Sequence, residues 1–134
     1  MHIEDIGKSI IDSCFAVHSE LGPGVLESAY EQCLSYELQL RGHTVERQKP
    51  QPITYKELTI EDAYKIDLLV DDQIIIELKT VDLLLPVHHA QLLTYLKFSK
   101  KTLGYLVNFR TLLMKDGLHR KVLNHPHQIS PKNP

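Results

Sequence analysis

Apolar side chains recur every three or four residues through the first forty positions of the chain. Within residues 3–21 they fall at Ile3, Ile6, Ile10, Cys14, Val17 and Leu21, which is the spacing of an amphipathic helix. Gly22-Pro23-Gly24 interrupts this pattern, which resumes at Val25 and continues to Leu38 before Gly42. The sequence therefore predicts two helices joined by a tight turn.

The pattern changes at residue 44, where short extended pieces replace the helical spacing. Pieces centred on Val45, Ile53-Thr54-Tyr55 and Leu58-Thr59-Ile60 are separated by Pro50 and Pro52. Residues of this kind between turn formers are typical of short strands and turns.

Two apolar runs within residues 63–80 flank Asp71-Asp72-Gln73 and predict a β-hairpin. Alternation puts apolar residues on one face of each strand: Ile66, Leu68 and Val70 on the first, and Ile74, Ile76 and Leu78 on the second. A loop centred on Asp72 sets these residues opposite one another, whereas a slip by one residue would mix the faces. In this register Asp67 lies opposite Glu77, so we expect two neighbouring carboxylates on the face away from the apolar set.

The remaining elements complete the expected fold. A helix is predicted for residues 88–99 after Pro86, an apolar strand for residues 104–109, and an edge strand within residues 112–122. The order ααβββαβ predicts an α/β (α+β) fold with a central mixed sheet flanked by helices. We expect a single domain over residues 1–123 and a mobile tail over residues 124–134, which holds almost no apolar residues.

Composition narrows the class of protein. The chain has 134 residues, a length typical of one domain, and its longest apolar runs are too short to cross a bilayer. Its first residues lack the basic start and apolar stretch of a signal peptide, so we expect a cytoplasmic protein without a membrane segment. Cys14 and Cys33 fall in predicted helices, and in a reducing compartment we expect both to be buried and unpaired.

The charges are distributed unevenly along the chain. The net charge of −2 does not suggest a nucleic-acid-binding protein, but residues 97–121 carry seven basic side chains and only one acid, Asp116: Lys97, Lys100, Lys101, Arg110, Lys115, Arg120 and Lys121. This segment forms either a local basic surface or an ordinary solvated face, and charge alone does not decide between them.

The acids predicted to face each other in the hairpin are the main candidates for chemistry. Two carboxylates plus waters and a substrate phosphate are the usual way to hold Mg²⁺, so Asp67 and Glu77 are candidate ligands of Mg²⁺, or of Mn²⁺ in its place. Lys79 projects from the same strand face as Glu77 and could orient a water or stabilise developing charge. The alternative is a polar outer face with incidental salt bridges, but the almost wholly apolar strands favour a functional site.

The chain also resembles a known family. Residues 24–30 match the pattern G-x-x-E-x-x-Y, and the chain is similar to the GxxExxY proteins of the PD-(D/E)xK nuclease superfamily. The likeness continues in order through Tyr55-Lys56, Lys65-Ile66-Asp67-Leu68, Glu77-Leu78-Lys79, Gln91-Leu92-Leu93-Thr94-Tyr95-Leu96 and Gly104-Tyr105-Leu106-Val107-Asn108-Phe109. It implies a restriction-endonuclease-like fold.

The resemblance also implies roles for single residues. Asp67 takes the first strand position of the family motif, and Glu77 and Lys79 form its E-x-K. Gln91 and Tyr95 look like the Q-x-x-x-Y of the RecB-like and lambda-exonuclease-like lineage, where this pair lines the site near the substrate. Lys65 stands where many members have Arg, and lysine cannot make the bidentate contact of a guanidinium. It remains a candidate substrate contact.

Two residues of the G-x-x-E-x-x-Y segment have alternative explanations. Glu27 lies in the first turn of a predicted helix, where the helix dipole favours a carboxylate. In nucleases of this superfamily an acid from such a helix often holds a water or a second metal, so we favour a catalytic role. Tyr30 lies one turn later and is core, site lining, or both. Gln91 and Tyr95 would also fit a plain surface helix.

Taken together, the sequence predicts a metal-dependent nuclease that hydrolyses phosphodiester bonds in DNA or RNA. Asp67 and Glu77 would hold the metal, and Lys79 and Glu27 would support the attacking water. The partners expected are DNA or RNA and no membrane, and the chain could form a homodimer. The alternative is a non-catalytic nucleic-acid-binding or protein-interaction module on the same fold.

Overall fold

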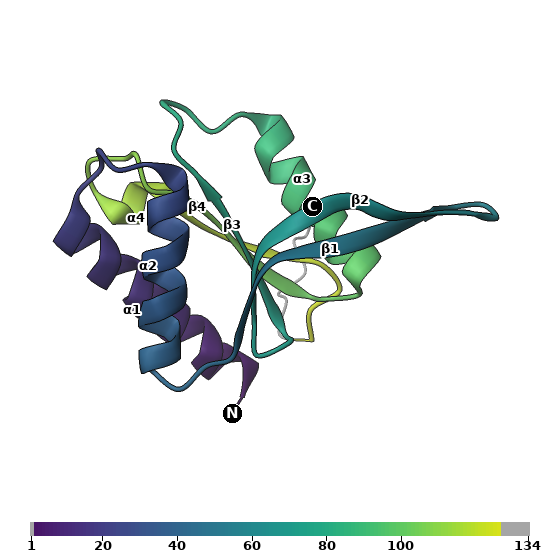
Figure 1. Ribbon diagram of the computed structural model, residues 1–134, viewed down its shortest axis with the longest axis horizontal. Coiled ribbons are helices and arrows are strands. Elements are labelled where there is room, and N and C mark those ends of the chain that lie inside the picture. Colours follow the sequence, from purple (N-terminus) through teal and green to yellow (C-terminus); the bar gives the residue numbers. More distant parts are fainter. Residues whose placement is uncertain (1, 127–134) are drawn as a thin grey trace.

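The computed structural model describes residues 2–126, which form a five-stranded mixed sheet with helices on both faces (Figure 1). In chain order the elements are α1 (Ile3–Leu21), α2 (Glu27–Leu40), β1 (Val45–Tyr55), β2 (Leu58–Val70), β3 (Ile74–Lys79), α3 (Pro86–Ser99), β4 (Leu103–Asn108), α4 (Met114–Gly117) and β5 (Leu118–Val122). The predicted fold class and the order ααβββαβ are confirmed, with α4 and β5 following at the end.

The sheet has the strand order β1-β2-β3-β4-β5. Only β3 and β4 run parallel, and they are connected through α3, whereas the other neighbours are antiparallel. Every residue of β3 from Ile74 to Leu78 is buried, as expected for a central strand covered on both faces.

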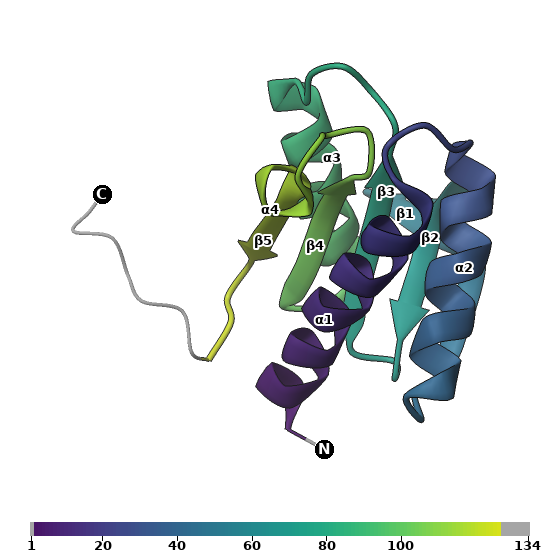
Figure 2. The same cartoon turned by 90° about the vertical axis from the view of Figure 1, so that its left-hand side faces the viewer.

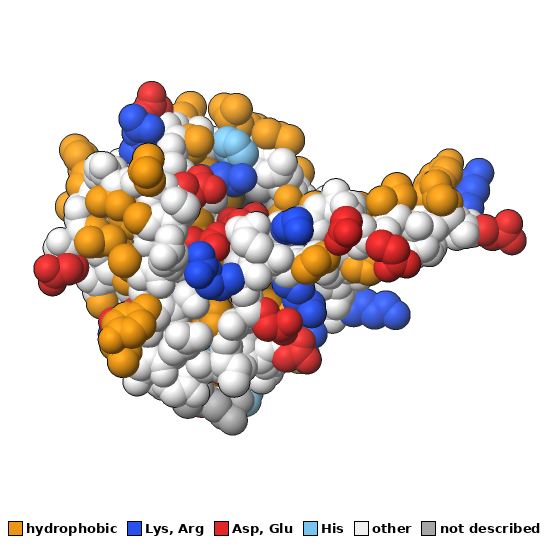
Figure 3. All heavy atoms as spheres, viewed as in Figure 1, with side chains coloured by type: hydrophobic (Ala, Val, Ile, Leu, Met, Phe, Trp, Pro, Cys, Tyr) orange, Lys and Arg blue, Asp and Glu red, His pale blue; other side chains and the backbone are white. Residues whose placement is uncertain are grey.

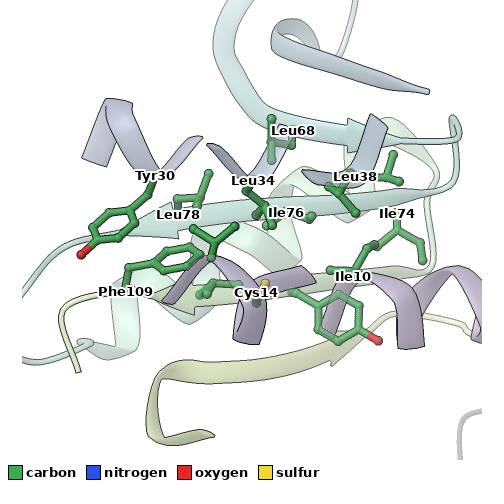
Figure 4. Packing of buried hydrophobic residues seen from close by; sticks show 14 of the residues in the cluster. Ile10, Cys14, Tyr30, Leu34, Leu38, Leu68, Ile74, Ile76, Leu78 and Phe109 are labelled. Carbon is green, nitrogen blue, oxygen red and sulfur yellow. The ribbon is translucent and has the colours of Figure 1, made fainter. Parts of the chain in front are cut away.

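Two apolar clusters lie on the two faces of the sheet. The larger cluster packs α1 and α2 against the sheet (Figure 4), and the smaller one packs α3 against the opposite face. Figure 2 shows α1 and α2 side by side in front of the strands, with α3 behind them. Gly104 allows α3 to approach closely, because a Cβ at this position would lie 3.0 Å from a methyl group of Leu92.

Strands β1 and β2 are longer than the short pieces predicted for residues 44–60. They form one continuous hairpin whose turn is Lys56-Glu57, with a register shift between Gln51 and Ile53. Pro50 and Pro52 are accommodated because β1 is an edge strand, where an absent amide hydrogen leaves no neighbouring strand unpaired.

The predicted register of the β2–β3 hairpin is confirmed where the strands pair, because Leu68, Leu69 and Val70 lie opposite Ile76, Ile75 and Ile74. The predicted face of Ile66 is wrong. Ile66 packs in the α3 cluster with Leu69, whereas Leu68 and Val70 pack in the α1–α2 cluster. Strict alternation therefore fails at Asp67. Gln48, the residue of β1 opposite Asp67, has a left-handed backbone with φ of 50°, so the irregularity spans both strands.

Three other expectations need adjustment. The third helix begins two residues earlier than predicted, with Pro86 in its first turn, where proline is favoured. Within residues 112–122 only β5 is a strand, at the sheet edge as expected, and a single helical turn precedes it. Cys14 is buried as predicted but Cys33 is exposed, and both thiols are free.

The predicted tail begins inside the described residues. His125 is buried at 4% exposure, and its ring nitrogens lie 2.6 Å from Glu4 Oε2 and 2.9 Å from Thr102 Oγ1. These contacts fix this part of the chain against α1. Residues 127–134 of the predicted tail lie outside the described residues. Within residues 2–126, no helix has the length and apolar content needed to span a membrane.

Candidate active site

The strands β2 and β3 separate at the acids that the sequence predicts to face each other. Backbone pairing ends at Leu68 and Ile76, and side chains replace the next ladder hydrogen bonds. The amide of Asp67 donates to Glu77 Oε1 at 3.0 Å, and the amide of Leu78 donates to Asp67 Oδ2 at 2.9 Å. Each carboxylate is thus fixed by the backbone of the opposite strand, which satisfies the amides left free by the opening.

Glu77 is the most deeply buried acid of this group, with an exposed fraction of 5%. Burial, and then the charge of Asp67, raise its pKa well above the ordinary value for a glutamate. The hydrogen bond from the Asp67 amide and the charge of Lys79 act in the opposite direction. A carboxyl in this position gains from any cation that arrives beside it.

Lys79 and Glu27 lie close enough to these acids to influence them. Lys79 is the last residue of β3, is half-buried, and acts on the charges of both Glu77 and Glu27. Glu27 stands in the first turn of α2 and is exposed overall. Loss of hydration around its carboxyl, followed by the charge of Asp67, nevertheless raises its pKa, against the effect of Lys79 and of hydrogen bonding with Thr80. All four predicted catalytic residues therefore share one region.

Tyr30 lies in the core rather than on the surface of this region. It is fully buried and stacks on Phe109 with ring centroids 4.6 Å apart (Figure 4). Its hydroxyl donates to the carbonyl of Gly22 and accepts from the amide of Val25 at 3.1 Å. Both lie in the loop that leads into α2. Tyr30 therefore holds the loop from which Glu27 projects, which gives the G-x-x-E-x-x-Y spacing a physical meaning.

Two residues that the sequence did not single out complete the surroundings of Asp67. The Gln48 side-chain amide donates to Glu31 Oε1 at 2.6 Å and to Asp67 Oδ1 at 3.1 Å. Glu31 is buried one helical turn after Glu27 and also accepts from Arg47 Nε at 3.1 Å. Both oxygens of Asp67 are consequently anchored. The i, i+4 spacing of Glu27 and Glu31 was a sequence signal for Glu31, whereas no such spacing pointed to Gln48.

The end of β3 is held by the next strand. The Asn108 side chain donates to the carbonyl of Val81 at 2.8 Å and accepts from its amide at 3.2 Å. Arg110 Nη1 donates to the carbonyl of Thr80 at 3.3 Å and its Nε lies 3.3 Å from Asp82. These contacts fix the direction in which the chain leaves Lys79.

Tyr95 comes to the site from α3. Its ring stacks on that of Tyr64 of β2 with centroids 4.0 Å apart. Burial, and then the charges of Glu77 and Asp67, raise the pKa of Tyr95 to about 12. The Tyr64 hydroxyl is buried and has no hydrogen-bond partner among the described residues. Tyr64 was missed because its position in the sequence looks like that of any strand residue.

The other predicted substrate contacts lie nearby with fewer constraints. Gln91 is half-buried one turn before Tyr95 on the same face of α3. Lys65 is exposed on β2, two residues before Asp67. Figure 3 shows acidic and basic side chains gathered in the middle of this view, beside the root of the projecting β1–β2 hairpin.

The basic residues of the segment 97–121 do not form one patch. Arg110 contacts Asp82 beside the site, Arg120 contacts Glu4 of α1, Lys101 contacts Asp72 of the β2–β3 turn, and Lys115 contacts its neighbour Asp116. A cavity of about 260 Å³ adjoins the site and is lined by Pro23, Gly24, Val25, Leu26, Glu27, Thr80 and Arg110. Near the carboxylates, Lys79 acts on Glu77 and Glu27 and Arg47 contacts Glu31, whereas Arg110 lies beside the cavity.

Comparison with known protein families gives a match. A family model described as the PD-(D/E)XK nuclease superfamily matches residues 4–121. No curated protein and no solved structure matches the chain.

Proposed function

The chain belongs to the PD-(D/E)XK nuclease superfamily, and from this premise we propose that it is a metal-dependent nuclease that hydrolyses phosphodiester bonds in DNA or RNA. Most members of this superfamily are nucleases, and a mixed sheet flanked by helices is consistent with its restriction-endonuclease-like fold. We further assign the chain to the GxxExxY group and its RecB-like lineage, on the G-x-x-E-x-x-Y segment and the pair Gln91 and Tyr95.

The opening of the β2–β3 ladder supports this proposal more than any other observation. A sheet optimised for stability would continue its backbone pairing past Leu68, yet two acids interrupt it there. The two carboxylates face the same opening, and one of them is buried with a raised pKa. Two like charges held close together at a buried position destabilise the fold, and such an arrangement is typical of functional sites.

The donor set fits a hard divalent cation. Asp67 and Glu77 supply carboxylate oxygens that each retain lone pairs after accepting one amide hydrogen bond. Within residues 2–126 no cluster of three or more His, Cys, Asp or Glu could hold a metal, so waters and a substrate phosphate would complete the shell, as is usual for Mg²⁺. When bound here, Mg²⁺ or Mn²⁺ would polarise a phosphoryl oxygen and lower the pKa of a water.

Lys79 and Glu27 are the residues we assign to the attacking water. The Lys79 ammonium lies near both Glu77 and Glu27, so it can donate to a water held between them and stabilise the negative charge that develops on the phosphoryl oxygens. Glu27 has a raised pKa and is close to solvent, which suits a group that accepts a proton from that water or orients it.

We assign the role of contacting the substrate to four residues, which are Tyr95, Tyr64, Gln91 and Lys65. The Tyr64 hydroxyl is buried without a partner among the described residues, and its ring lies close enough to Glu77 for the charge of that acid to act on it. The stacked Tyr95 and Tyr64 rings form one wall beside the acids, Gln91 adds an amide to the same helix face, and Lys65 is free to approach a phosphate from the exposed side.

A digestion series tests the proposal. Plasmid, linear duplex, single-stranded DNA and RNA would be incubated with the protein in Mg²⁺, Mn²⁺, Ca²⁺ or EDTA. We expect cleavage of at least one substrate in Mg²⁺ or Mn²⁺, loss of cleavage in Asp67→Asn and Glu77→Gln, and normal cleavage in Asp72→Asn, which changes an exposed acid at the β2–β3 turn. Binding without cleavage of any substrate would instead support the non-catalytic module.

A thermal shift measurement provides a readout that does not depend on finding the right substrate. Addition of Mn²⁺ should raise the Tm of the wild type, because a ligand of the folded state stabilises it by mass action. The double variant Asp67→Ala, Glu77→Ala should lose this shift. A shift of unchanged size in the double variant would show that the ion binds elsewhere.

A further inference from the structure

Two cavities adjoin the chain where it leaves β3. The first is lined in part by Glu27 and Arg110. The second has a volume of about 240 Å³ and lies between the β3–α3 connection, the end of β4 and the elements α3, α4 and β5. The residues that line it are Asp82, Leu83, Leu84, His89, Asn108, Thr111, Asp116 and His119.

The second cavity is close to the candidate active site. Asn108, which lines it, is the residue of β4 that lies opposite Lys79 in the parallel pairing of β3 and β4. Neighbouring strands are only about 4.8 Å apart. Asp82 also lines this cavity and lies 3.3 Å from Nε of Arg110, which lines the first one. A nucleic-acid strand with a phosphate at Lys79 therefore has an adjacent base within reach of the second cavity.

Two imidazole rings contribute to the wall of the second cavity. His89 stands near the start of α3 and His119 stands in β5 (Figure 2), and their ring centroids are 5.3 Å apart with an angle of 76° between the ring planes. Nδ1 of His89 is buried and has no hydrogen-bond partner within residues 2–126. A buried polar atom without a partner costs free energy, which a ligand atom that reached it would recover.

The His89 ring is predominantly neutral at neutral pH. Burial, followed by the charges of Lys121, His119 and His88, lowers its pKa. A neutral imidazole offers one donor, one acceptor and a flat ring face. It suits an uncharged ligand with a flat ring and hydrogen-bonding edges.

The other lining residues narrow the class of ligand. Asp82 and Asp116 place two carboxylates around the cavity, and none of the described residues that line it is a lysine or arginine. A phosphate group would be repelled by these acids. Zinc, which imidazoles suit, takes three or four protein ligands, and no group of three or more His, Cys, Asp and Glu side chains within residues 2–126 could hold a metal ion.

Size and apolar contacts agree with a nucleobase. At about 30 Å³ per water, the cavity has room for roughly eight waters, and a pyrimidine or purine ring displaces a similar volume. Leu84 packs against the α3 cluster, and Leu83 is 71% exposed and accessible to a ligand. Aromatic and apolar side chains of this kind hold the extruded base in enzymes that take a base out of its stack.

We propose that the second cavity binds one unpaired base of the nucleic-acid substrate, next to the phosphate that is cleaved. The base stacks on an imidazole ring, and Asp116 accepts a hydrogen bond from its exocyclic amino group. Cytosine, adenine and guanine carry such a group, whereas thymine and uracil do not. This site rests on the proposed nuclease function and defines its substrate class as single-stranded or locally unpaired strands, because a base that is already unpaired costs least to extrude.

Homopolymers of equal length test the preference for an amino-bearing base. Oligo(dC) and oligo(dT) carry the same phosphates, as do oligo(rC) and oligo(rU), so a difference in affinity within a pair reports the bases. Fluorescence anisotropy in Ca²⁺, which replaces Mg²⁺ to prevent cleavage, should show about 10-fold tighter binding of the cytosine polymer by the wild type.

Matched variants assign this preference to the cavity. Asp116→Asn should bring the affinity ratio close to one, because the amide can donate to thymine or uracil as well as accept from cytosine. His119→Ala should weaken binding of the cytosine polymer by about 10-fold through loss of stacking. Lys115→Ala is the control, because Lys115 neighbours Asp116 but does not line the cavity, and it should keep both the affinity and the ratio.

Histidine ring signals in NMR spectra give a second measurement that needs no change of binding. The cytosine polymer in Ca²⁺ should shift the ring signals of His89 and His119, and the spectrum of His119→Ala identifies which signal belongs to His119. A sugar–phosphate oligomer of the same length without bases should leave both signals in place.

Each result supports the base site or removes it. A wild type that binds none of the four polymers would overturn the proposed function and the base site together. Equal affinity for the two polymers of a pair, or an unchanged ratio in Asp116→Asn, would overturn the base site alone. Equal shifts of both rings with the base-free oligomer would overturn it too and assign the cavity to the backbone of the strand. Circular dichroism checks the fold of both variants, whose substituted side chains are exposed at Asp116 and half-buried at His119.

Discussion

Two acids at opposite ends of the paired part of one hairpin occupy contrasting environments. Asp71 lies at the β2–β3 turn, where it accepts hydrogen bonds from the Thr44 amide at 2.9 Å and from the His43 ring at 2.6 Å. Burial acts to raise the pKa of Asp71, but the hydrogen bonds from His43 and Thr44 outweigh it and lower that pKa. Four residues earlier, Asp67 faces Glu77, whose pKa is raised.

The two environments affect the stability of the folded protein in opposite directions. At the turn, the buried His43 ring bridges Asp71 and the hydroxyl of Ser9 at 2.8 Å, so the acid ties α1 to the hairpin. At the opening, the same type of side chain increases the electrostatic free energy of the folded state, because two carboxylates approach each other in a poorly hydrated place. Under the proposed function, the lowered pKa of Asp71 belongs to an acid that stabilises the fold, and the raised pKa of Glu77 belongs to an acid of the proposed metal site.

Among the substitutions proposed, that of Lys79 beside the β2–β3 opening should have the largest effect, which is a loss of turnover. If Lys79 stabilises the transition state, Lys79→Ala should reduce turnover by about 100- to 1,000-fold while changing substrate affinity much less. Lys115→Ala, which removes an exposed lysine beside Asp116, serves as the control and should keep wild-type turnover. Cleavage would be measured in Mg²⁺ and binding in Ca²⁺ with the same labelled oligonucleotide. Equal turnover in both variants would remove Lys79 from the catalytic residues.

Removing the support of Asp67 should have the next largest effect. Gln48→Met keeps the length of the side chain but cannot bridge Glu31 and Asp67, so kcat should fall by about 10- to 100-fold with little change in KM. Gln51→Met removes an amide from the same strand that contacts α3 instead. It should lower Tm without lowering kcat. Parallel losses of Tm and kcat in both variants would reduce Gln48 to a structural role.

The acid at the turn should contribute stability and no activity. Asp71→Asn tolerates the left-handed backbone of this position, removes the charge and replaces one of the two acceptor oxygens by an amide group, so it should lower the free energy of unfolding by about 1–2 kcal/mol at neutral pH. Because the folded-state pKa of Asp71 is lowered, its contribution is present above the pKa of the unfolded chain and disappears as pH falls through the folded-state value.

Urea denaturation at pH 7 and at successively lower pH would measure this contribution. Asp72→Asn is the control, because Asp72 has a similar backbone conformation but only an exposed contact with Lys101. Its effect should stay below about 0.5 kcal/mol. A deficit in Asp71→Asn that persists unchanged into acid would show that shape rather than charge matters there.

The smallest expected effect is a gain in thermal stability rather than a loss, and it comes from the substitution of Glu77. Glu77 has a raised folded-state pKa, so the contribution of its neutral form is present below the unfolded pKa and is lost as pH rises through the folded value. Glu77→Gln should therefore raise the Tm of the metal-free protein at neutral pH by roughly a few degrees, and should not raise it in acid. Differential scanning calorimetry in EDTA at both pH values would measure this. A lower Tm at neutral pH would contradict the comparison.

The sequence alone determined the parts of this protein that follow from local periodicity. Spacings of three and four residues located α1 and α2, and α3 was recognised with an error only at its start. The β1–β2 region was recognised as extended chain, but its two long strands were predicted as short pieces. The period of two in strands, with one loop position, also determined the register of the β2–β3 pairing, beyond which Asp67 lies beside Glu77. The E-x-K spacing put Lys79 on the face of Glu77 for the same reason. These inferences needed only the identities of residues that are close together in the sequence.

Tertiary structure decided what those residues contact. Four features depend on contacts between different elements: the packing of Ile66 on the α3 face, the bridge from Gln48 to Glu31, the burial of Tyr30 and the contact of His43 with Asp71. The same is true of the β1–β2 hairpin, whose strands look in sequence like short pieces broken by prolines. Periodicity reports which way a side chain points within its own element, whereas hydration, hydrogen bonding and pKa depend on the groups that packing brings to it.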